Sequence, residues 1–404
     1  MKREPDFFPL TYVMNPGRMI TDPCGKKAPP AAIKSWKEGI CLTTGNRRLQ
    51  SVDAMKALAI LTVVFYHLMA PCAVHTVLRH IIDPMLILFF FCSGYFHKPG
   101  RRTPGENIRI RLKTTMVPFI KYSLLFWFIG SVWMVTAGTE TVMEALWCLR
   151  NFFGGCIWNR VIQNWFGWEY HSLGKRYFFL ADFWFLPAML FAGILFFLIA
   201  DKVLSSRKKT TLCAAACLAV TGILLAFHID LPYNIHLVPF WAAFILLGAF
   251  AGQKKLFGHP PLSGAKGWGL SLLLLAAGIT LAMFKPEVPN LFRGHFPEDE
   301  VVSMLLTTAA SLLIICGLGM VCRLAEIKGF RMKELAWLGS HSLTVYLWHM
   351  FFAWIICMIT GTSIGYPDNA DAGLVFRSVL LSFGCLVLSV LCAVVTDKIK
   401  ARRS

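Results

Sequence analysis

Ten apolar runs, each long enough or nearly long enough to cross a lipid bilayer, limit what this chain can fold into. They lie near residues 54–74, 79–96, 115–137, 177–200, 211–228, 235–253, 267–284, 301–322, 336–360 and 373–396. About 20 consecutive apolar residues form one membrane-spanning helix. Of the 404 residues, 56% are hydrophobic and only 15% are charged, which excludes a soluble domain of this length. The sequence therefore predicts an all-α fold, a polytopic membrane helical bundle of about ten transmembrane helices.

The positions of the basic residues predict how these helices are oriented. The formal net charge is +18, but the charges lie in short loops between apolar runs, so we expect no nucleic-acid partner. If the N-terminus is cytoplasmic, most of the 40 Lys and Arg residues face the cytoplasm. Acidic residues are more frequent in the predicted outer loops, as in PEDE at 297–300. We therefore expect both termini in the cytoplasm and a multi-pass protein of the cell (inner or plasma) membrane.

Composition also divides the chain into segments. Residues 1–47 are polar, interrupted by Pro and Gly and without a signal-peptide pattern, so we expect a disordered cytoplasmic tail. The transmembrane domain then covers residues 48–397, and residues 398–404 form a basic cytoplasmic tail.

No internal repeat is visible in the sequence. The 13 cysteines have no zinc-like spacing, so we expect no metal site. Cys148 and Cys156 share a loop and could form a disulfide.

The first apolar run carries charged and titratable residues that a passive anchor would not need. Asp53 and Lys56 lie at its start, and His67 follows eleven positions after Lys56. On a helix this spacing places Lys56 and His67 within about 20° of one face and roughly 16 Å apart. We expect His67 near mid-membrane, where ionisable groups are costly and often functional. A histidine that hydrogen-bonds a neighbouring helix for packing is the alternative.

Polar residues interrupt two further runs. In FFFCSGYF (89–96), Ser93 and Gly94 predict a small surface for close helix approach at the cytoplasmic end of the second helix. In ADFWFLPAML (181–190), Asp182 and Trp184 lie at the predicted outer end of the fourth helix. Both stretches are candidates for a buried site.

The ninth run, within ELAWLGSHSLTVYLWHMFF, contains a polar stripe. Ser342, Tyr346 and His349 follow helical spacing and share one face. His349 lies about as far into its run as His67 does into the first, so the two histidines could meet. A polar packing seam between helices is the alternative.

Two loops are also notable. The segment 97–113 carries six basic residues after the second helix, either to set the topology or to bind phosphates. The predicted outer segment 138–176 is rich in aromatic residues, which form an interfacial belt or stack on sugar rings. These aromatic residues are Trp147, Trp158, Trp165, Trp168 and Tyr170.

The chemistry that fits these residues is proton transfer on a hydroxyl group. The sequence contains no Walker loop, no GxGxxG and no HExxH motif. A neutral imidazole can accept a proton from an alcohol as the alcohol attacks a thioester carbonyl. A transporter or permease with a path through Lys56, His67 and His349 is the alternative.

Five features in order along the chain resemble the acyltransferase 3 family of integral membrane O-acyltransferases, and in particular its fucose 4-O-acetylase-like branch. The matching elements are Asp53, Lys56 and His67 in the first helix, FFxxSGY at 89–95, a basic stretch before proline (Arg111, Lys113, Pro118), WFL at 184–186, and G-x-x-S-x-x-x-Y-x-x-H (Gly339, Ser342, Tyr346, His349). The resemblance covers residues 48–397.

The resemblance implies transfer of an acyl group, commonly from acetyl-CoA, to a hydroxyl of a surface carbohydrate or lipid-linked sugar. The implied site residues are catalytic His67 and Asp53, donor-binding Lys56, Ser93, Arg109, Arg111 and Lys113, and acceptor-side Asp182, Trp184, Ser342, Tyr346 and His349. The donor is acyl-CoA as a substrate, with no tightly bound cofactor. Whether transfer is direct or passes through an acyl-enzyme stays open.

The sequence departs from the family in two respects. The first helix carries Lys56 where arginine is usual, which keeps the charge but loses bidentate recognition of a phosphate or carboxylate. No esterase-like domain follows the tenth run, so any acyl relay of that kind would need a separate extracytoplasmic partner protein.

Overall fold

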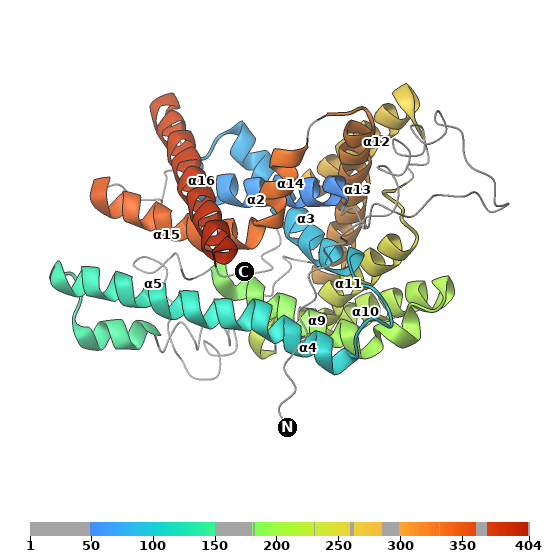
Figure 1. The fold of residues 1–404 in the computed structure, drawn as a ribbon, viewed down its shortest axis with the longest axis horizontal. Helices are drawn as coiled ribbons and strands as arrows, with labels where there is room; N and C mark the ends of the chain where they lie inside the picture. The colour runs from blue at the N-terminus through green and yellow to red at the C-terminus, as the bar shows by residue number, and fades with distance from the viewer. Residues whose placement is uncertain are drawn as a thin grey trace, which may run out of the picture. The chain divides into compact units, whose positions relative to one another are not determined.

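The computed structural model of the chain describes residues 49–149, 180, 182–229, 231–258, 262–284, 299–330, 332–360 and 370–402. Within these residues the fold is all-α, with no strand (Figure 1). Ten helices are long and apolar enough to cross a membrane, which confirms the predicted fold class. The predicted tail at 1–47 lies outside the described residues, and the orientation of the termini stays a prediction.

The helices follow one another along the chain with short turns between several of them (Figure 1). In the first half they are α2 (Gln50–Leu68), α3 (Ala73–Tyr95), α4 (Pro104–Arg111), a π-helical turn η1 (Leu112–Met116) and α5 (Val117–Thr136). Next come η3 (Asp182–Trp184), α9 (Phe185–Val203), α10 (Arg207–Ala226), η4 (Pro232–Leu237) and α11 (Val238–Gln253). The last are α12 (Gly264–Met283), α13 (Glu300–Ile327), α14 (Lys333–Ser340), α15 (Ser342–Thr360) and α16 (Ala372–Ala401).

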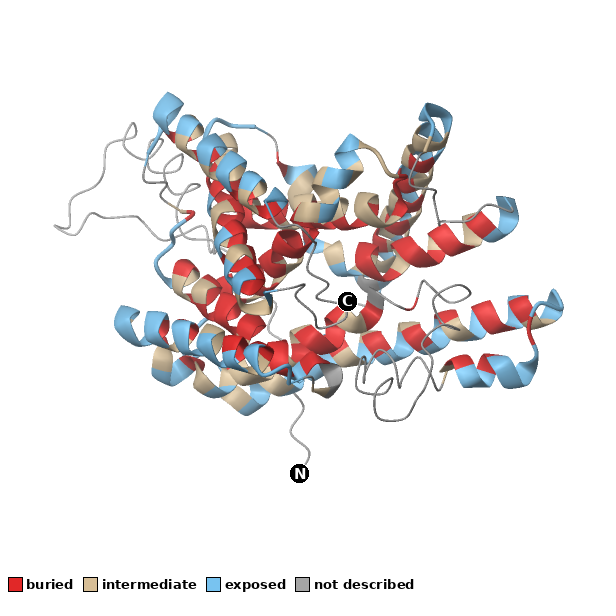
Figure 2. Ribbon diagram, turned by 180° about the vertical axis from the view of Figure 1, so that it is seen from behind, coloured by how far each residue is buried: buried red, intermediate tan, exposed pale blue. Residues whose placement is uncertain are grey.

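The core is built around α2, α3 and α11. Among the ten membrane-spanning helices, these three have the largest shares of buried residues; buried residues are red in Figure 2. In α10, α12 and α16, by contrast, most residues of the apolar stretch are not buried. In a membrane bundle, exposed apolar faces are suited to contact lipid tails. The polar residues of interest therefore lie on the inner helices.

Three glycines bring α3 and α11 into backbone contact. A Cβ atom added at Gly94 would collide with the backbone of Ile245, and one added at Gly248 or Gly252 would collide with the backbone of α3. Gly248 and Gly252 have GxxxG spacing, which allows two membrane helices to approach closely. The close approach predicted for Gly94 is confirmed.

Two predicted helix boundaries differ in the structure. Helix α2 ends at Leu68, so His67 lies in its last turn and not in the middle of the helix. The cause is Pro71, because the residue before a proline is driven out of the helical region. The ninth run forms two helices, α14 and α15, which are separated at His341.

The final helix also extends beyond its predicted limit. Helix α16 continues to Ala401, so the predicted basic tail at 398–404 begins inside it.

The glycine contact predicts a specific response to substitution. Gly248→Ala should destabilise the protein by about 1–3 kcal/mol, because the added methyl group forces two backbones apart. Gly384→Ala on α16 is the matched control, since a Cβ there meets no atom within 4 Å. Thermal unfolding of the purified variants measures the difference. Equal melting temperatures for both would contradict a tight α3–α11 contact.

Candidate active site

Helix α2 holds a buried ion pair near its N-terminal end. The Lys56 ammonium lies 2.7 Å from a carboxylate oxygen of Asp53, one helical turn earlier. Helix α14 lies against this part of α2, because Gly339 packs directly on the backbone at Asp53 and Ala57. Pairing offsets part of the cost of burying both charges. The arrangement keeps the Lys56 charge at a fixed point of the helix.

At the other end of α2, His67 meets His349 of α15. The centroids of the two imidazole rings are 5.8 Å apart, so the structure brings together two residues that the sequence predicted could meet. His349 is fully buried, and its Nδ1 lies 2.8 Å from the carbonyl oxygen of Tyr346. A carbonyl only accepts hydrogen bonds, so Nδ1 of His349 donates its proton to this oxygen.

Two residues beside His67 were missed from the sequence. Tyr66 packs edge-to-face on His67 and stacks on His75 of α3, with ring centroids 4.9 and 5.8 Å apart. The ring of His75 also hydrogen-bonds the backbone carbonyl of Tyr66. This bond satisfies a carbonyl in the last turn of α2, where no intrahelical donor remains. His75 thereby fixes the end of the helix that carries His67.

A row of aromatic rings extends from His349 to the start of α9. Tyr346 lies 6.1 Å from His349 and 5.6 Å from Phe185, and Phe185 lies 5.9 Å from Trp184. Two predicted acceptor residues, Trp184 and Tyr346, are therefore connected to the histidine pair. Ser342 is the first residue of α15, and Asp182 begins the short turn η3.

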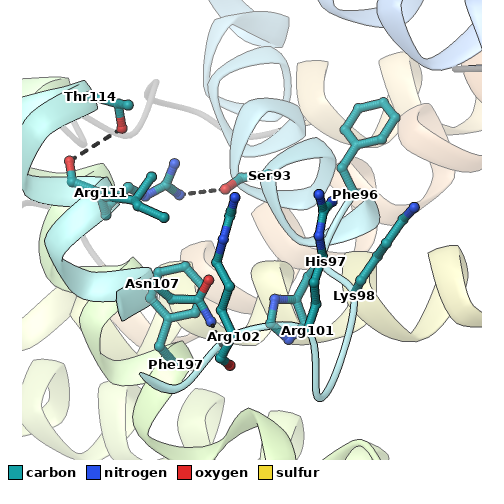
Figure 3. A pocket seen from close by; sticks show the side chains of 11 residues that line it. Ser93, Phe96, His97, Lys98, Arg101, Arg102, Asn107, Arg111, Thr114 and Phe197 are labelled. Atoms are coloured by element: carbon teal, nitrogen blue, oxygen red, sulfur yellow. Dashed lines mark hydrogen bonds between the residues drawn. The ribbon is translucent and has the colours of Figure 1, made fainter. Parts of the chain in front are cut away.

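A cavity of about 210 Å³ lies where α3, α4 and α9 meet (Figure 3). The cationic residues that line it are Lys98, Arg101, Arg102 and Arg111. Arg101 and Arg102 precede α4, which starts with a capping box: the Thr103 hydroxyl accepts the amide of Glu106, and the Glu106 carboxylate accepts the amide of Thr103. This cap fixes where the loop ends and the helix begins.

Arg111 forms the inner wall of this cavity. Its guanidinium donates a hydrogen bond to the Ser93 hydroxyl, and Thr114 lies nearby (Figure 3). In the described part of the chain, its buried Nε has no hydrogen-bond partner. Gly193 of α9 makes room for the side chain, because a Cβ atom there would lie 2.9 Å from Nε. The guanidinium therefore has donor capacity left for an anion in the cavity.

Two further predicted donor-binding cations lie on the surface. Arg109 and Lys113 are exposed and do not line the cavity. Each is two positions from Arg111, and two positions on a helix correspond to about 200° of rotation. When Arg111 faces inward, its two neighbours must face outward. Lys98, Arg101 and Arg102 lie beside it instead, from the same basic loop that the sequence identified.

His97, which lines the cavity, contributes little charge. The His97 ring packs on Phe196 and Phe197, with centroids 4.9 and 5.9 Å away. Burial lowers the pKa of His97 below its ordinary value, although the Asp201 carboxylate partly opposes this shift. His97 is therefore neutral at pH 7, and the lysine and the three arginines supply the positive charge of the cavity.

The cavity lies beside the C-terminal end of α3, whereas the histidine pair lies at the C-terminal end of α2. The Lys56 ammonium lies 5.8 Å from the ring of Phe96, which lines the cavity. Because only four residues separate α2 from α3, the helices are antiparallel neighbours, and His67 lies roughly 16 Å further along α2.

Some predictions fall on residues that the structure does not describe. Trp158, Trp165, Trp168 and Tyr170 lie outside the described ranges, as does Cys156 of the suggested disulfide. Within the described residues, no group of three or more His, Cys, Asp or Glu side chains could hold a metal ion.

The cavity makes a testable prediction about anions. Inorganic pyrophosphate should raise the melting temperature of the wild-type protein, and Arg111→Gln should abolish that rise. Gly193→Ala should also reduce it, because the new methyl group displaces the guanidinium. Gly269→Ala is the matched control, since its Cβ meets no atom within 4 Å. Equal stabilisation of wild type, Arg111→Gln and Gly193→Ala would contradict anion binding here.

Residues 49–397 match a protein-family model described as an acyltransferase domain. This match favours an enzyme over the transporter alternative. No curated protein and no solved structure matches the chain.

Proposed function

The chain belongs to the acyltransferase 3 family and is a membrane acyltransferase, and from this premise we propose that it moves an acyl group from acyl-CoA to a hydroxyl of a surface glycan or lipid-linked sugar. The observation that supports the proposal is a cationic cavity beside the C-terminal end of α3 together with a separate histidine pair between α2 and α15. The cavity would hold the phosphates of the donor, and the histidines would meet its thioester.

The donor assignment follows from charge and size. Arginine guanidinium groups form paired, charge-assisted hydrogen bonds with phosphate oxygens, and three arginines and a lysine line this cavity. Its volume of about 210 Å³ is below the usual range for a drug-sized ligand, so it accommodates only part of acyl-CoA. We assign it the phosphate groups, with the long pantetheine arm directed along α2 past Lys56 towards His67. Acetyl-CoA is the acyl-CoA that we would test first.

The reaction needs one general base. His67 would accept the proton of the acceptor hydroxyl as its oxygen attacks the thioester carbonyl. The carbon–sulfur bond then breaks, and the protonated His67 returns the proton to the departing thiolate. His349, whose ring faces His67, would help to orient the same hydroxyl. Asp53 would act by holding Lys56 in place through their ion pair.

The acceptor would approach along the row of aromatic rings. Flat aromatic faces stack on the apolar faces of sugar rings, and Trp184 and Tyr346 are both linked to His349 through ring contacts. Trp184 precedes α9, whereas Gly193, nine residues further on, contacts the donor-side Arg111. With the predicted topology, the donor enters from the cytoplasm and the acceptor from the opposite side.

The first test concerns sidedness. Inverted membrane vesicles that contain the protein and enclose lipid-linked sugars of the host should transfer label from external acetyl-CoA to the enclosed acceptor. His67→Gln should reduce this transfer by about 10²–10⁴-fold, because the general base is lost. Mass spectrometry of the released glycans locates the label. Wild-type transfer that occurs only when donor and acceptor share one side would overturn the two-sided arrangement.

The second test separates donor from acceptor residues. Arg111→Gln should raise KM for acetyl-CoA and leave KM for the acceptor unchanged. Trp184→Leu should raise KM for the acceptor and leave KM for acetyl-CoA unchanged. The expected rise is about 3–10-fold, the amount for one lost stacking contact. Trp133→Leu is the control for Trp184→Leu, because it removes a tryptophan on α5 that is 45% exposed. An equal rise of both KM values in each variant would contradict the assignment.

A further inference from the structure

The joint between α14 and α15 is a single residue with an unusual set of partners. His341 leaves the helical conformation, with φ −104° and ψ 11°. Its backbone amide bonds the carbonyls of Trp337 and Leu338, and its own carbonyl accepts the amides of Thr344 and Val345. His341 therefore ends one helix and starts the next.

Both ring nitrogens of His341 face hydrogen-bond acceptors. Nε2 lies 2.8 Å from a carboxylate oxygen of Asp397 on α16, and Nδ1 lies 2.8 Å from the carbonyl oxygen of Trp337. The Ser340 hydroxyl, 3.0 Å from Nδ1, already donates its proton to the same carbonyl. A carbonyl and a carboxylate can only accept, so each nitrogen bonds its partner only when it carries a proton. When the ring carries both protons, both bonds form at once and His341 pairs with Asp397 as a cation.

The position of this cation is favourable for the helix that it ends. A positive charge at a helix C-terminus interacts well with the unpaired carbonyls of the last turn. The ring also lies on Trp337, with centroids 4.3 Å apart. The side chains of His341 and Asp397 remain 16% and 41% exposed, so solvent weakens their attraction and the pair adds little to overall stability.

The two helices that meet at His341 contact the two ends of the site. On one side, Gly339 of α14 packs on the α2 backbone at Asp53, next to the Lys56 ion pair. On the other, α15 carries His349, whose ring faces His67. The angle at His341 therefore sets where His349 lies relative to α2. Asp397 is 56 positions away in sequence and ties this angle to α16.

We propose that the His341–Asp397 ion pair is a positioning device that fixes α15, and with it His349, against His67. This inference rests on the proposed function, because the reaction needs both histidines at one hydroxyl. Neither residue touches the substrates. A small displacement of a reacting group can lower a rate by up to about 10²-fold, so a pair of little global stability can still control turnover.

The experiment is a double-mutant cycle read out as steady-state kinetics in vesicles with labelled acetyl-CoA. Asp397→Asn and His341→Gln should each lower kcat about 10-fold while KM for acetyl-CoA changes less than about twofold. The double variant should be no slower than either single variant, because both remove the same interaction. Asp397→Glu should recover most of kcat. Lys398→Gln, the exposed neighbour on α16, is the matched control and should behave as wild type.

Specific outcomes would overturn the inference. Wild-type kcat in Asp397→Asn would do so, as would additive losses in the double variant. A fall in melting temperature that matches the loss of activity would identify a general structural role. These results are distinguishable from failure of the proposed function, in which the wild-type protein itself would transfer no label.

Discussion

Because Gly94, Gly248 and Gly252 lack side chains, the backbones of α3 and α11 lie in direct contact, and much of the site depends on that contact. Helices in a membrane gain little from hydrophobic burial against one another, so close packing of small residues has to hold them together. Ser93 directly precedes Gly94, and its hydroxyl receives the Arg111 hydrogen bond. The position of the cationic cavity therefore follows from a packing contact made by residues with no chemistry of their own.

Charged groups in this protein are held by specific partners close to the helix packing. Lys56 is paired with Asp53, Arg111 is bonded to Ser93, and Gly339 brings α14 onto the helix that carries the first pair. An unpaired charge among apolar helices is costly, whereas a paired one keeps a defined position. Such fixed cations suit a donor that carries phosphates. The histidine pair, by contrast, sits among aromatic rings, which suits a neutral sugar.

Much of the fold and part of the site could be predicted from the sequence. Hydropathy gave the ten helices, and helical spacing placed Tyr346 and His349 on one face and suggested the encounter with His67. The small residues Ser93 and Gly94 also indicated the close helix approach that the structure shows. These features depend on local periodicity, which a single sequence displays directly.

The remaining features depend on contacts between distant segments or on local helix geometry. Gly193 lies 82 positions after Arg111, and Asp397 lies 56 positions after His341, so no local pattern links them. The sequence did not predict that Arg111 faces inward while Arg109 and Lys113 face outward. Such a prediction depends on the basic loop becoming helical at Pro104. The end of the first helix was predicted too late because the apolar run continues past Pro71, whereas the helix does not.

The most direct test of the two-level site is a cryo-electron microscopy structure of the full chain with a non-transferable acyl-CoA analogue. The account predicts phosphate oxygens within hydrogen-bond distance of Arg111 and of Arg101 or Arg102. It also predicts the carbonyl that replaces the thioester between His67 and His349. Phosphates bound away from this cavity, or a carbonyl remote from both histidines, would contradict it.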